Sequence, residues 1–294
     1  MTLPRSAAVD MTRANAARLY DYVLGGKDHF AVDRAAAERI TAVYPFAPLT
    51  ALEGRAFVGR AVRYLSRVAG IRQFIDLGSG LPAAENVHEV AHRIDPDARV
   101  VYVDNDPVAV SHGQALLAVG GKVEMIEGDL CEPEEVIHHP ELQKLIDFDE
   151  PVAILITNVL QWITDDEDPY GAVARYKRAM PRGSYLVLSH CAIPDPEEDL
   201  AYRRPVEAIC REIICTLTSR PYDEILRFFD GFELLEPGLV PVTDWRPEVP
   251  HLVAVPTWDE TNDRLGEPSR EVAAVIKDRK NRKWLLDGGV GRKV

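Results

Sequence analysis

The chain has 294 residues, of which 46% are hydrophobic and 28% are charged, values typical of a globular protein and unlike those of a disordered chain. Its formal net charge of −13 repels a phosphate backbone, which argues against nucleic acid as a partner and favours a small molecule or a protein. The sequence has no secretory leader and no run of about 18 apolar residues, so we expect a cytoplasmic protein that does not enter a membrane. A homodimer is a further expectation.

The first seventy residues have apolar side chains at helical spacing. The periodic stretches are Asn15–Gly25, Asp33–Val43 and Leu52–Ala69. We therefore expect a helical N-terminal cap over residues 1–70.

From Arg72 onward, short apolar stretches typical of strands alternate with helical stretches. The expected strands are Gln73–Gly78, Arg99–Asp104, Val123–Asp129, Pro151–Thr157 and Ser184–His190. The helices between them are Ala84–Ile94, Pro107–Val119, Pro133–Ile146 and Pro169–Met180. This alternation predicts an α/β core over residues 71–294, Rossmann-like and doubly wound, with a mostly parallel sheet of seven strands.

The C-terminal third is less regular. We expect helices over Pro196–Leu217 and Tyr222–Phe229 and a strand over Phe232–Pro237. Either His251–Trp258 or Trp284–Lys293 can supply the final strand, and the charged segment 259–283 reads as a surface excursion. Its basic run, Lys277–Lys283, is interpreted as a solvated face.

The four cysteines form no Cys-x-x-Cys pair and lie in apolar or helical stretches. We expect core thiols rather than metal ligands or disulfides, and no bound metal. They are Cys131, Cys191, Cys210 and Cys215.

A glycine-rich turn follows the first expected strand and is the strongest functional motif. In Asp76-Leu77-Gly78-Ser79-Gly80, the glycines allow a ligand to approach the backbone closely, so Gly78 and Gly80 are expected ligand contacts. The turn also fits a dinucleotide motif, since Gly78-x-Gly80-x-x-Ala83 is followed by an acidic residue 24 positions beyond Gly80. Asp76 favours the other interpretation, because a carboxylate there suits a ligand with a cationic end, such as S-adenosylmethionine.

Two more acidic positions follow the second and third expected strands. Asp104 can accept both hydroxyls of a ribose, and Asn105 beside it is a further expected contact. Asp106 is an alternative ribose contact, but it precedes Pro107 and is interpreted more naturally as a helix cap. Asp129 can accept from an adenine amino group, with Leu130 offering an apolar face. The carboxyl ends of successive parallel strands form the edge where such sheets bind ligands.

With these motifs the chain resembles the class I S-adenosylmethionine-dependent methyltransferases, and more narrowly the bacterial S-adenosyl methyltransferase family. The resemblance spans nearly the whole chain and rests on Ala17–Arg34, Arg72–Ala91, Arg99–Val110, Asp168–Tyr176, Gly183–His190 and Gly288–Lys293. It implies the class I methyltransferase fold and S-adenosylmethionine as cofactor. It also places the stretch around Tyr22 and Gly26 near the site, where the Gly25-Gly26 break could let Tyr22, Lys27 or His29 fold over the cofactor.

The acceptor side is expected after the fourth strand. Asn158 and Gln161 lie where class I enzymes place groups that face the methyl donor, and Asn158 also counts among the cofactor contacts. The resemblance implies a histidine at the position of Gln161, and an amide cannot act as a general base. His190 and His29 are the other catalytic candidates.

Together these residues predict a methyltransferase that uses S-adenosylmethionine and acts on a small-molecule acceptor. Methyl transfer needs little more than in-line positioning, so the missing base is compatible with activity. Two alternatives stay open: a protein that binds S-adenosylmethionine without methyl transfer, and an NAD-dependent oxidoreductase.

Overall fold

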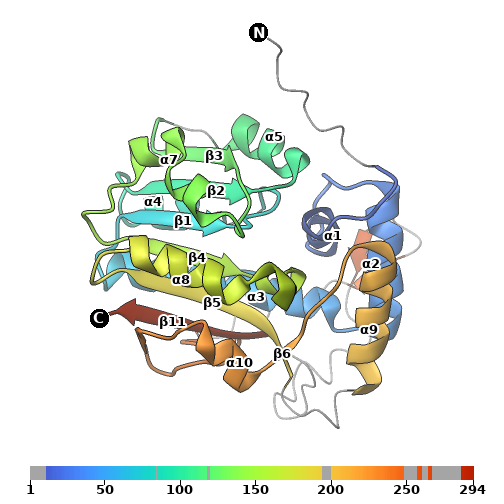
Figure 1. Cartoon of the computed structure of the whole chain (residues 1–294). Helices are drawn as coiled ribbons and strands as arrows, with labels where there is room; N and C mark the ends of the chain where they lie inside the picture. Colours follow the sequence, from blue (N-terminus) through green and yellow to red (C-terminus); the bar gives the residue numbers. More distant parts are fainter. Residues whose placement is uncertain are drawn as a thin grey trace.

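A central, mostly parallel sheet organises the chain in a computed structural model that describes residues 11–83, 85–117, 120–193, 200–247, 257–259, 264–266 and 286–294. Its main path has the order β3-β2-β1-β4-β5-β11-β7. The strands are β1 Gln73–Leu77, β2 Arg99–Asp104, β3 Val123–Glu127, β4 Ala153–Thr157, β5 Tyr185–Ile193, β7 Phe232–Leu234 and β11 Leu286–Lys293. Strands β1 to β5 pair in parallel, whereas β11 is antiparallel to β5 and β7 (Figure 1). The expected mostly parallel, doubly wound fold is confirmed.

Two short strands bring the described sheet to nine: β6, Arg220–Pro221, beside β5, and β8, Val240–Pro241, beside β11. The final strand of the core is β11, so of the two alternatives in the sequence the C-terminal one forms it. Of the other alternative, residues 251–256 lie outside the described residues. Thr257–Asp259 forms β9, which within the described ranges pairs with β10, Arg264–Gly266, in a separate two-stranded sheet.

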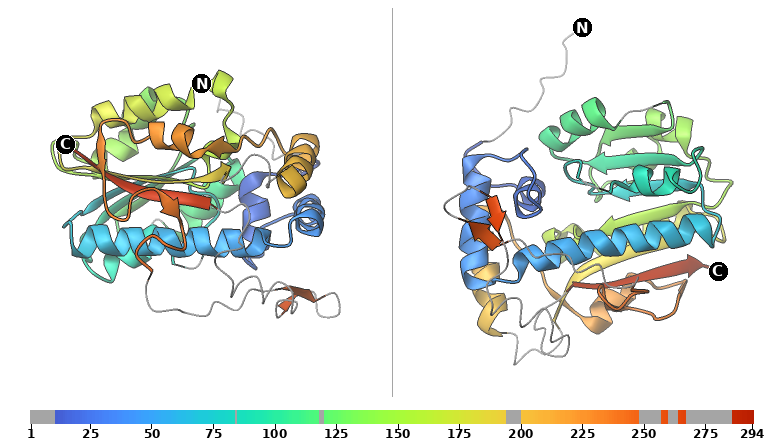
Figure 2. Two further views of the ribbon diagram at one scale, coloured as in Figure 1. Left: turned by 90° about the horizontal axis from the view of Figure 1, so that it is seen from below. Right: turned by 180° about the vertical axis from the view of Figure 1, so that it is seen from behind.

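Helices cover both faces of the sheet because successive strand residues point to opposite sides. On one face, α3 Ala47–Arg67, α4 Val87–His92 and α5 Pro107–Leu116 pack against side chains such as Phe74 and Val100. On the other, α6 Pro133–Ile137, α7 Pro140–Leu145, α8 Pro169–Ala179 and α10 Tyr222–Arg227 pack against Ile75 and Val101. The long helix α3 runs along the sheet (Figure 2), so the last helix of the expected cap contributes to the core.

A third group of helices lies beyond the carboxyl ends of the parallel strands (Figure 1): α1 Ala16–Val23, α2 Ala31–Val43 and α9 Leu200–Ile213. They share an apolar cluster that is separate from both faces of the sheet. Among the described helices, none is both long and apolar enough to cross a bilayer.

Several element boundaries differ from the sequence expectation for reasons of local chemistry. The single helix expected over Pro133–Ile146 is two helices, since Pro140 begins a new one with His139 as its cap. Helix α4 begins at Val87, because Asn86 caps it and accepts from Ala83 N–H. The start expected for α9, Pro196, lies outside the described residues.

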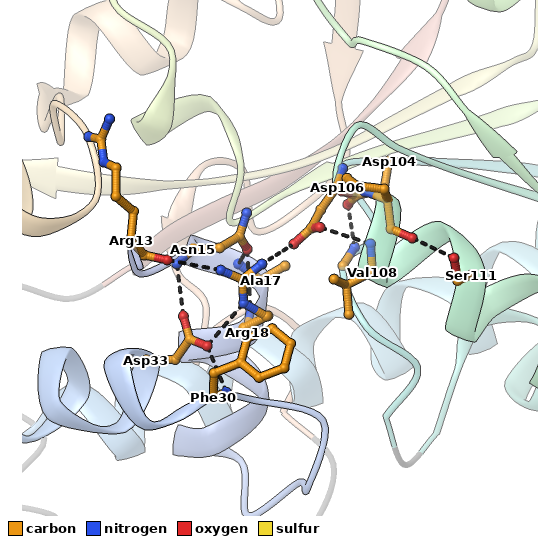
Figure 3. Close-up of polar contacts among 12 residues, drawn as sticks. Arg13, Asn15, Ala17, Arg18, Phe30, Asp33, Asp104, Asp106, Val108 and Ser111 are labelled. Carbon is orange, nitrogen blue, oxygen red and sulfur yellow. Dashed lines mark hydrogen bonds and ion pairs between the residues drawn. The ribbon is translucent and has the colours of Figure 1, made fainter. Parts of the chain in front are cut away.

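A buried ion-pair network joins the N-terminal helices to the core (Figure 3). Arg18 on α1 is 3% exposed and donates to two carboxylates: Nε to Asp33 at 3.0 Å and Nη1 to Asp106 at 3.2 Å. Asp33 also accepts from the backbone N–H groups of Asn15 and Phe30. Asp106 also accepts from Val108 N–H, so it caps α5 as expected.

Replacing Arg18 with alanine should strongly destabilise the protein. Removal of the guanidinium leaves two buried carboxylates without their cation, which typically costs about 3–5 kcal/mol of unfolding free energy. Urea unfolding followed by circular dichroism measures the loss.

The matched control is Arg39→Ala. Arg39 on α2 pairs with Glu212 on α9 at 2.8 Å, but both side chains are largely exposed, so solvent and salt screen their attraction. The unfolding free energy of this variant should stay close to that of the wild type. Equal losses in the two variants would contradict a special role for Arg18.

Candidate functional site

A cavity of about 500 Å³ lies between the carboxyl ends of β1 to β4 and the helices α1, α2 and α9. Its volume is within the range of small-molecule sites. Most of the residues expected from the sequence line it: Asp76, Gly78, Gly80, Asp104, Asn105, Asp129, Leu130, Asn158 and Gln161. The other candidates are not among its lining residues: Tyr22, Gly26, His29 and His190.

The glycine turn after β1 is held by the neighbouring strand. Gly78 and Ser79 both donate their backbone N–H to the Val103 carbonyl, at 2.8 and 3.1 Å, and Gly80 N–H donates to Asp104 Oδ2 at 2.7 Å. Gly78 has a φ of +69°, and a Cβ there would lie 2.5 Å from a methyl group of Val159. The turn therefore requires glycine at position 78, and all three of its N–H groups are used within the protein.

Asp104 lies at the end of β2 with its carboxylate fixed at both oxygens. Oδ2 accepts from Gly80 and Oδ1 from Asp106 N–H at 2.9 Å. Desolvation by burial raises the pKa of Asp104, whereas these backbone hydrogen bonds lower it. Each carboxylate oxygen has a second lone pair, so Asp104 can still accept from a ligand.

Asp76 forms an acidic centre beside Arg55 at the end of β1. The Asp76 carboxyl is 5% exposed, and desolvation raises its pKa to about 7, while Arg55 lowers it and Asp104 raises it. Arg55 comes from α3, lines the same cavity and donates to Asn86 Oδ1 at 3.1 Å. A carboxyl and a guanidinium therefore face one part of the cavity, which suits a ligand that carries both an ammonium and a carboxylate.

The third strand contributes a more exposed part of the site. Asp129 accepts from Cys131 N–H at 2.8 Å and is exposed, as is Asn105. Leu130 is 6% exposed and packs into the apolar cluster on one face of the sheet. This part of the cavity thus combines an exposed carboxylate with an apolar wall.

Helix α1 presents Tyr20 to the cavity rather than Tyr22. The Tyr20 hydroxyl donates to the Ala51 carbonyl at 2.9 Å. Tyr22 instead contacts the His29 ring edge-on, with 4.9 Å between ring centroids, and its hydroxyl lies 3.4 Å from Glu38. Gly26 lies in the turn that ends α1 and donates to Asp21. The proposed folding of this stretch over a ligand stays a prediction.

Tyr20 and Arg55 are the site residues that sequence reasoning missed. Tyr20 lies three residues after Ala17, which is the closest contact for a Cβ built at Gly80, so the two share a face of α1. The sequence alone did not identify Tyr20, because the contact between Ala17 and the glycine turn is formed only in the folded chain. Arg55 had no signal either, because only the packing of α3 on the sheet brings it to Asp76.

Asn158 follows β4 in the left-handed region of backbone conformation, with a φ of +58°. Its side-chain amide packs against Gly54 of α3, where a Cβ would lie only 2.6 Å from Nδ2. A glycine in α3 therefore makes room for the strained residue that faces the cavity.

The two remaining catalytic candidates have different surroundings. His190 is fully buried: its Nε2 accepts from Arg220 Nη1 at 2.7 Å, its Nδ1 donates to the Cys191 carbonyl, and desolvation lowers its pKa to about 3. His190 is thus a neutral packing residue. Gln161 is 5% exposed and lines the cavity, and its Oε1 has no hydrogen-bond partner among the described residues.

All four cysteines line the cavity, and none of them forms a disulfide bond. Cys210 is buried as expected, and burial raises its pKa to about 12. Cys215 is exposed, so the expectation of a core position is wrong there, because it follows the last turn of α9 at the surface.

Replacing Gly54 with alanine should destabilise the protein, although alanine is the better helix former. The added methyl group would collide with Asn158 and with Leu286, which lies 3.0 Å away. The control is Gly59→Ala in the same helix, where the nearest atoms belong to the flexible end of Arg63 at 3.3 Å. That variant should gain about 0.5–1 kcal/mol of unfolding free energy. Urea unfolding distinguishes the two, and a gain in both would contradict the packing of Asn158 on α3.

Comparison with known proteins identifies the family of the chain. The model of the S-adenosyl methyltransferase family matches residues 3–293. A crystal structure from Thermobifida fusca YX, whose own assignment as a methyltransferase is an inference, is 36% identical, with 99% of each chain covered and a TM-score of 0.81. A DUF574 family protein from Streptomyces avermitilis MA-4680 is 33% identical over 97% of this chain and 100% of that one, again with a TM-score of 0.81. A search of curated proteins gave no match. The chain therefore belongs to the S-adenosyl methyltransferase family.

Proposed function

We propose that the protein binds S-adenosylmethionine in this cavity and transfers its methyl group to a small molecule. The observation that carries the proposal is that Asp76 and Arg55 line the same cavity within electrostatic range of each other, with Asp76 on β1, one strand away from Asp104. Asp76 would accept from the ammonium of the methionine end and Arg55 would hold its carboxylate. Asp104 would accept from the ribose, and Asp129 with Leu130 would contact the adenine.

The glycine turn also supports this ligand over a dinucleotide. A pyrophosphate is usually bound by free N–H groups of the turn and of the helix that starts there. Here the N–H groups of Gly78, Ser79 and Gly80 already donate to Val103 and Asp104, and α4 begins only at Val87. The formal dinucleotide motif in the sequence therefore lacks the donors that its function requires.

When bound, S-adenosylmethionine supplies an electrophilic methyl group on a sulfonium, and the electron pair of the broken bond stays on sulfur. The acceptor contributes the lone pair that forms the new bond and loses any surplus proton to water. No histidine is among the described residues that line the cavity. Asn158 and Gln161 are therefore assigned to orient the acceptor, so that positioning supplies most of the catalysis.

The remaining expectations from the sequence stay predictions. They are the cytoplasmic location, the absence of nucleic-acid and membrane partners, and the homodimer. The basic run 277–283 lies outside the described residues.

Substitution of Asp104 should remove most of the affinity for the cofactor. Loss of hydrogen bonds between a carboxylate and ribose hydroxyls should weaken binding at least about tenfold. Calorimetric titration of wild type and Asp104→Ala with S-adenosylmethionine, S-adenosylhomocysteine and NAD measures the effect. Asp104→Asn keeps the side-chain volume but removes the charge and leaves only one oxygen for the N–H groups of Gly80 and Asp106, so an equal loss in this variant would exclude lost packing as the cause.

The control is Asp97→Ala, at an exposed position just before the amino end of β2, where the carboxylate pairs with Lys122. Its affinity for the adenosyl ligands should equal that of the wild type. Binding of NAD in preference to both adenosyl ligands would refute the proposed cofactor.

The affinity for S-adenosylhomocysteine, which carries the same ammonium, should rise with pH. Asp76 has a pKa of about 7 in the free protein, so it is largely protonated and neutral at pH 6 and largely charged at pH 8. Because only the charged form attracts the ammonium, affinity should increase about tenfold between these pH values. In Asp76→Asn, affinity should be weak and nearly independent of pH over this range. A wild-type affinity that falls as pH rises would contradict this assignment of Asp76.

A further inference from the structure

The cavity continues from the strand ends into an apolar chamber beneath α2 and α9. We define the apolar chamber by lining residues from α1, α2, α9 and the segment after α9: Leu19, Val23, Ile40, Val206, Ile214 and Leu217. Helices α2 and α9 lie side by side (Figures 1 and 2), and an ion pair between Arg39 and Glu212 joins them. The chamber is therefore a built part of the fold.

The polar atoms in the wall of this chamber largely satisfy one another. The Tyr44 hydroxyl lies 3.0 Å from Thr50 Oγ1, which itself donates to the Phe46 carbonyl. The Tyr20 hydroxyl donates to the Ala51 carbonyl. The Cys210 thiol, with its raised pKa, is uncharged at neutral pH. These groups leave the chamber with little polarity to offer a ligand.

Gln161 is the exception. Its backbone carbonyl accepts from Thr218 N–H at 2.7 Å, which fixes the loop after β4 against the segment that follows α9. Its side chain is 5% exposed, and Oε1 has no partner in the described part of the chain. An unpaired buried acceptor is unfavourable unless a ligand donates to it.

Most of the charged side chains that line the cavity, Arg55, Asp76, Asp104 and Asp129, lie along the strand ends. Glu167 is the exception: it is exposed, accepts from Thr164 and acts electrostatically on Cys215, beside Ile214. None of the residues that define the apolar chamber carries a charge. An ionised ligand would therefore lose its hydration there without a compensating partner.

We infer that the apolar chamber binds the methyl acceptor, and that this acceptor is an uncharged, largely apolar small molecule with an N–H or O–H group that donates to Gln161. The identification of this ligand as the methyl acceptor rests on the proposed function. The preference of the chamber for a neutral ligand does not depend on it. Gln161 receives a hydrogen bond and no proton, so it orients the acceptor atom rather than ionising it.

Indole and 1-methylindole test this inference, because both are neutral rings of similar size and only indole has an N–H. Ligand-observed NMR titration of the full-length protein should show indole binding about three- to tenfold more tightly than 1-methylindole. Indole-3-carboxylate should bind more weakly than indole. In Gln161→Leu, the preference for indole over 1-methylindole should disappear.

The control variant is Gln143→Leu, at an exposed position on α7, which should keep the preference for indole. Val206→Phe, which reduces the space in the chamber, should weaken both neutral probes. The relative affinities of the wild-type protein for indole, 1-methylindole and indole-3-carboxylate test the inference even if a variant does not fold. Equal binding of indole and 1-methylindole, preferential binding of the carboxylate, or an unchanged preference in Gln161→Leu would overturn the inference.

Titration of the same samples with S-adenosylhomocysteine separates this inference from the proposed function. Binding of S-adenosylhomocysteine without selectivity for indole refutes the inference alone. Selectivity for indole without adenosyl binding refutes the methyltransferase proposal and leaves the chamber as a site for neutral ligands. Failure of both titrations refutes both.

Discussion

The ion pairs of Arg18 hold the N-terminal helices where the site requires them. Arg18 connects Asp33, at the start of α2, with Asp106, the cap of α5. Asp106 also donates its N–H to Asp104, so the network reaches the end of β2 directly. Arg18 compensates two buried carboxylates, which would be strongly unfavourable without a cation. It therefore fixes α1 over the glycine turn and closes the cavity on that side.

The enclosed cavity has two chemically different parts. Along the strand ends, carboxylates and one guanidinium face the space, as a zwitterionic nucleoside requires. Under α2 and α9, the walls are mainly apolar side chains, with hydroxyl groups that are hydrogen-bonded within the protein, and the Gln161 amide also lines the cavity. This division suits the charged cofactor and the uncharged acceptor that we propose, because each ligand would be desolvated only where the protein compensates for it.

The glycine turn shows why a motif alone cannot identify a ligand. The spacing of Gly78, Gly80 and Ala83 fits both a dinucleotide and an S-adenosylmethionine site. The two kinds of site differ in what the backbone N–H groups of the turn bind. Here these N–H groups donate to the Val103 carbonyl and the Asp104 carboxylate, so they are not available to a pyrophosphate. Such hydrogen bonds join residues far apart in the chain, and spacing does not reveal them.

By itself, the sequence determined the elements of the core, their parallel arrangement and the acidic positions at the strand ends, because periodicity and strand order place Asp76, Asp104 and Asp129 at one edge. It also determined the cap at Asp106. Only the tertiary structure decided that Tyr20 rather than Tyr22 faces the cavity, that His190 is packed against Arg220, and that Arg55 meets Asp76. These outcomes depend on the rotation of α1 and on the docking of α3 and β6, which are set by contacts between segments distant in sequence.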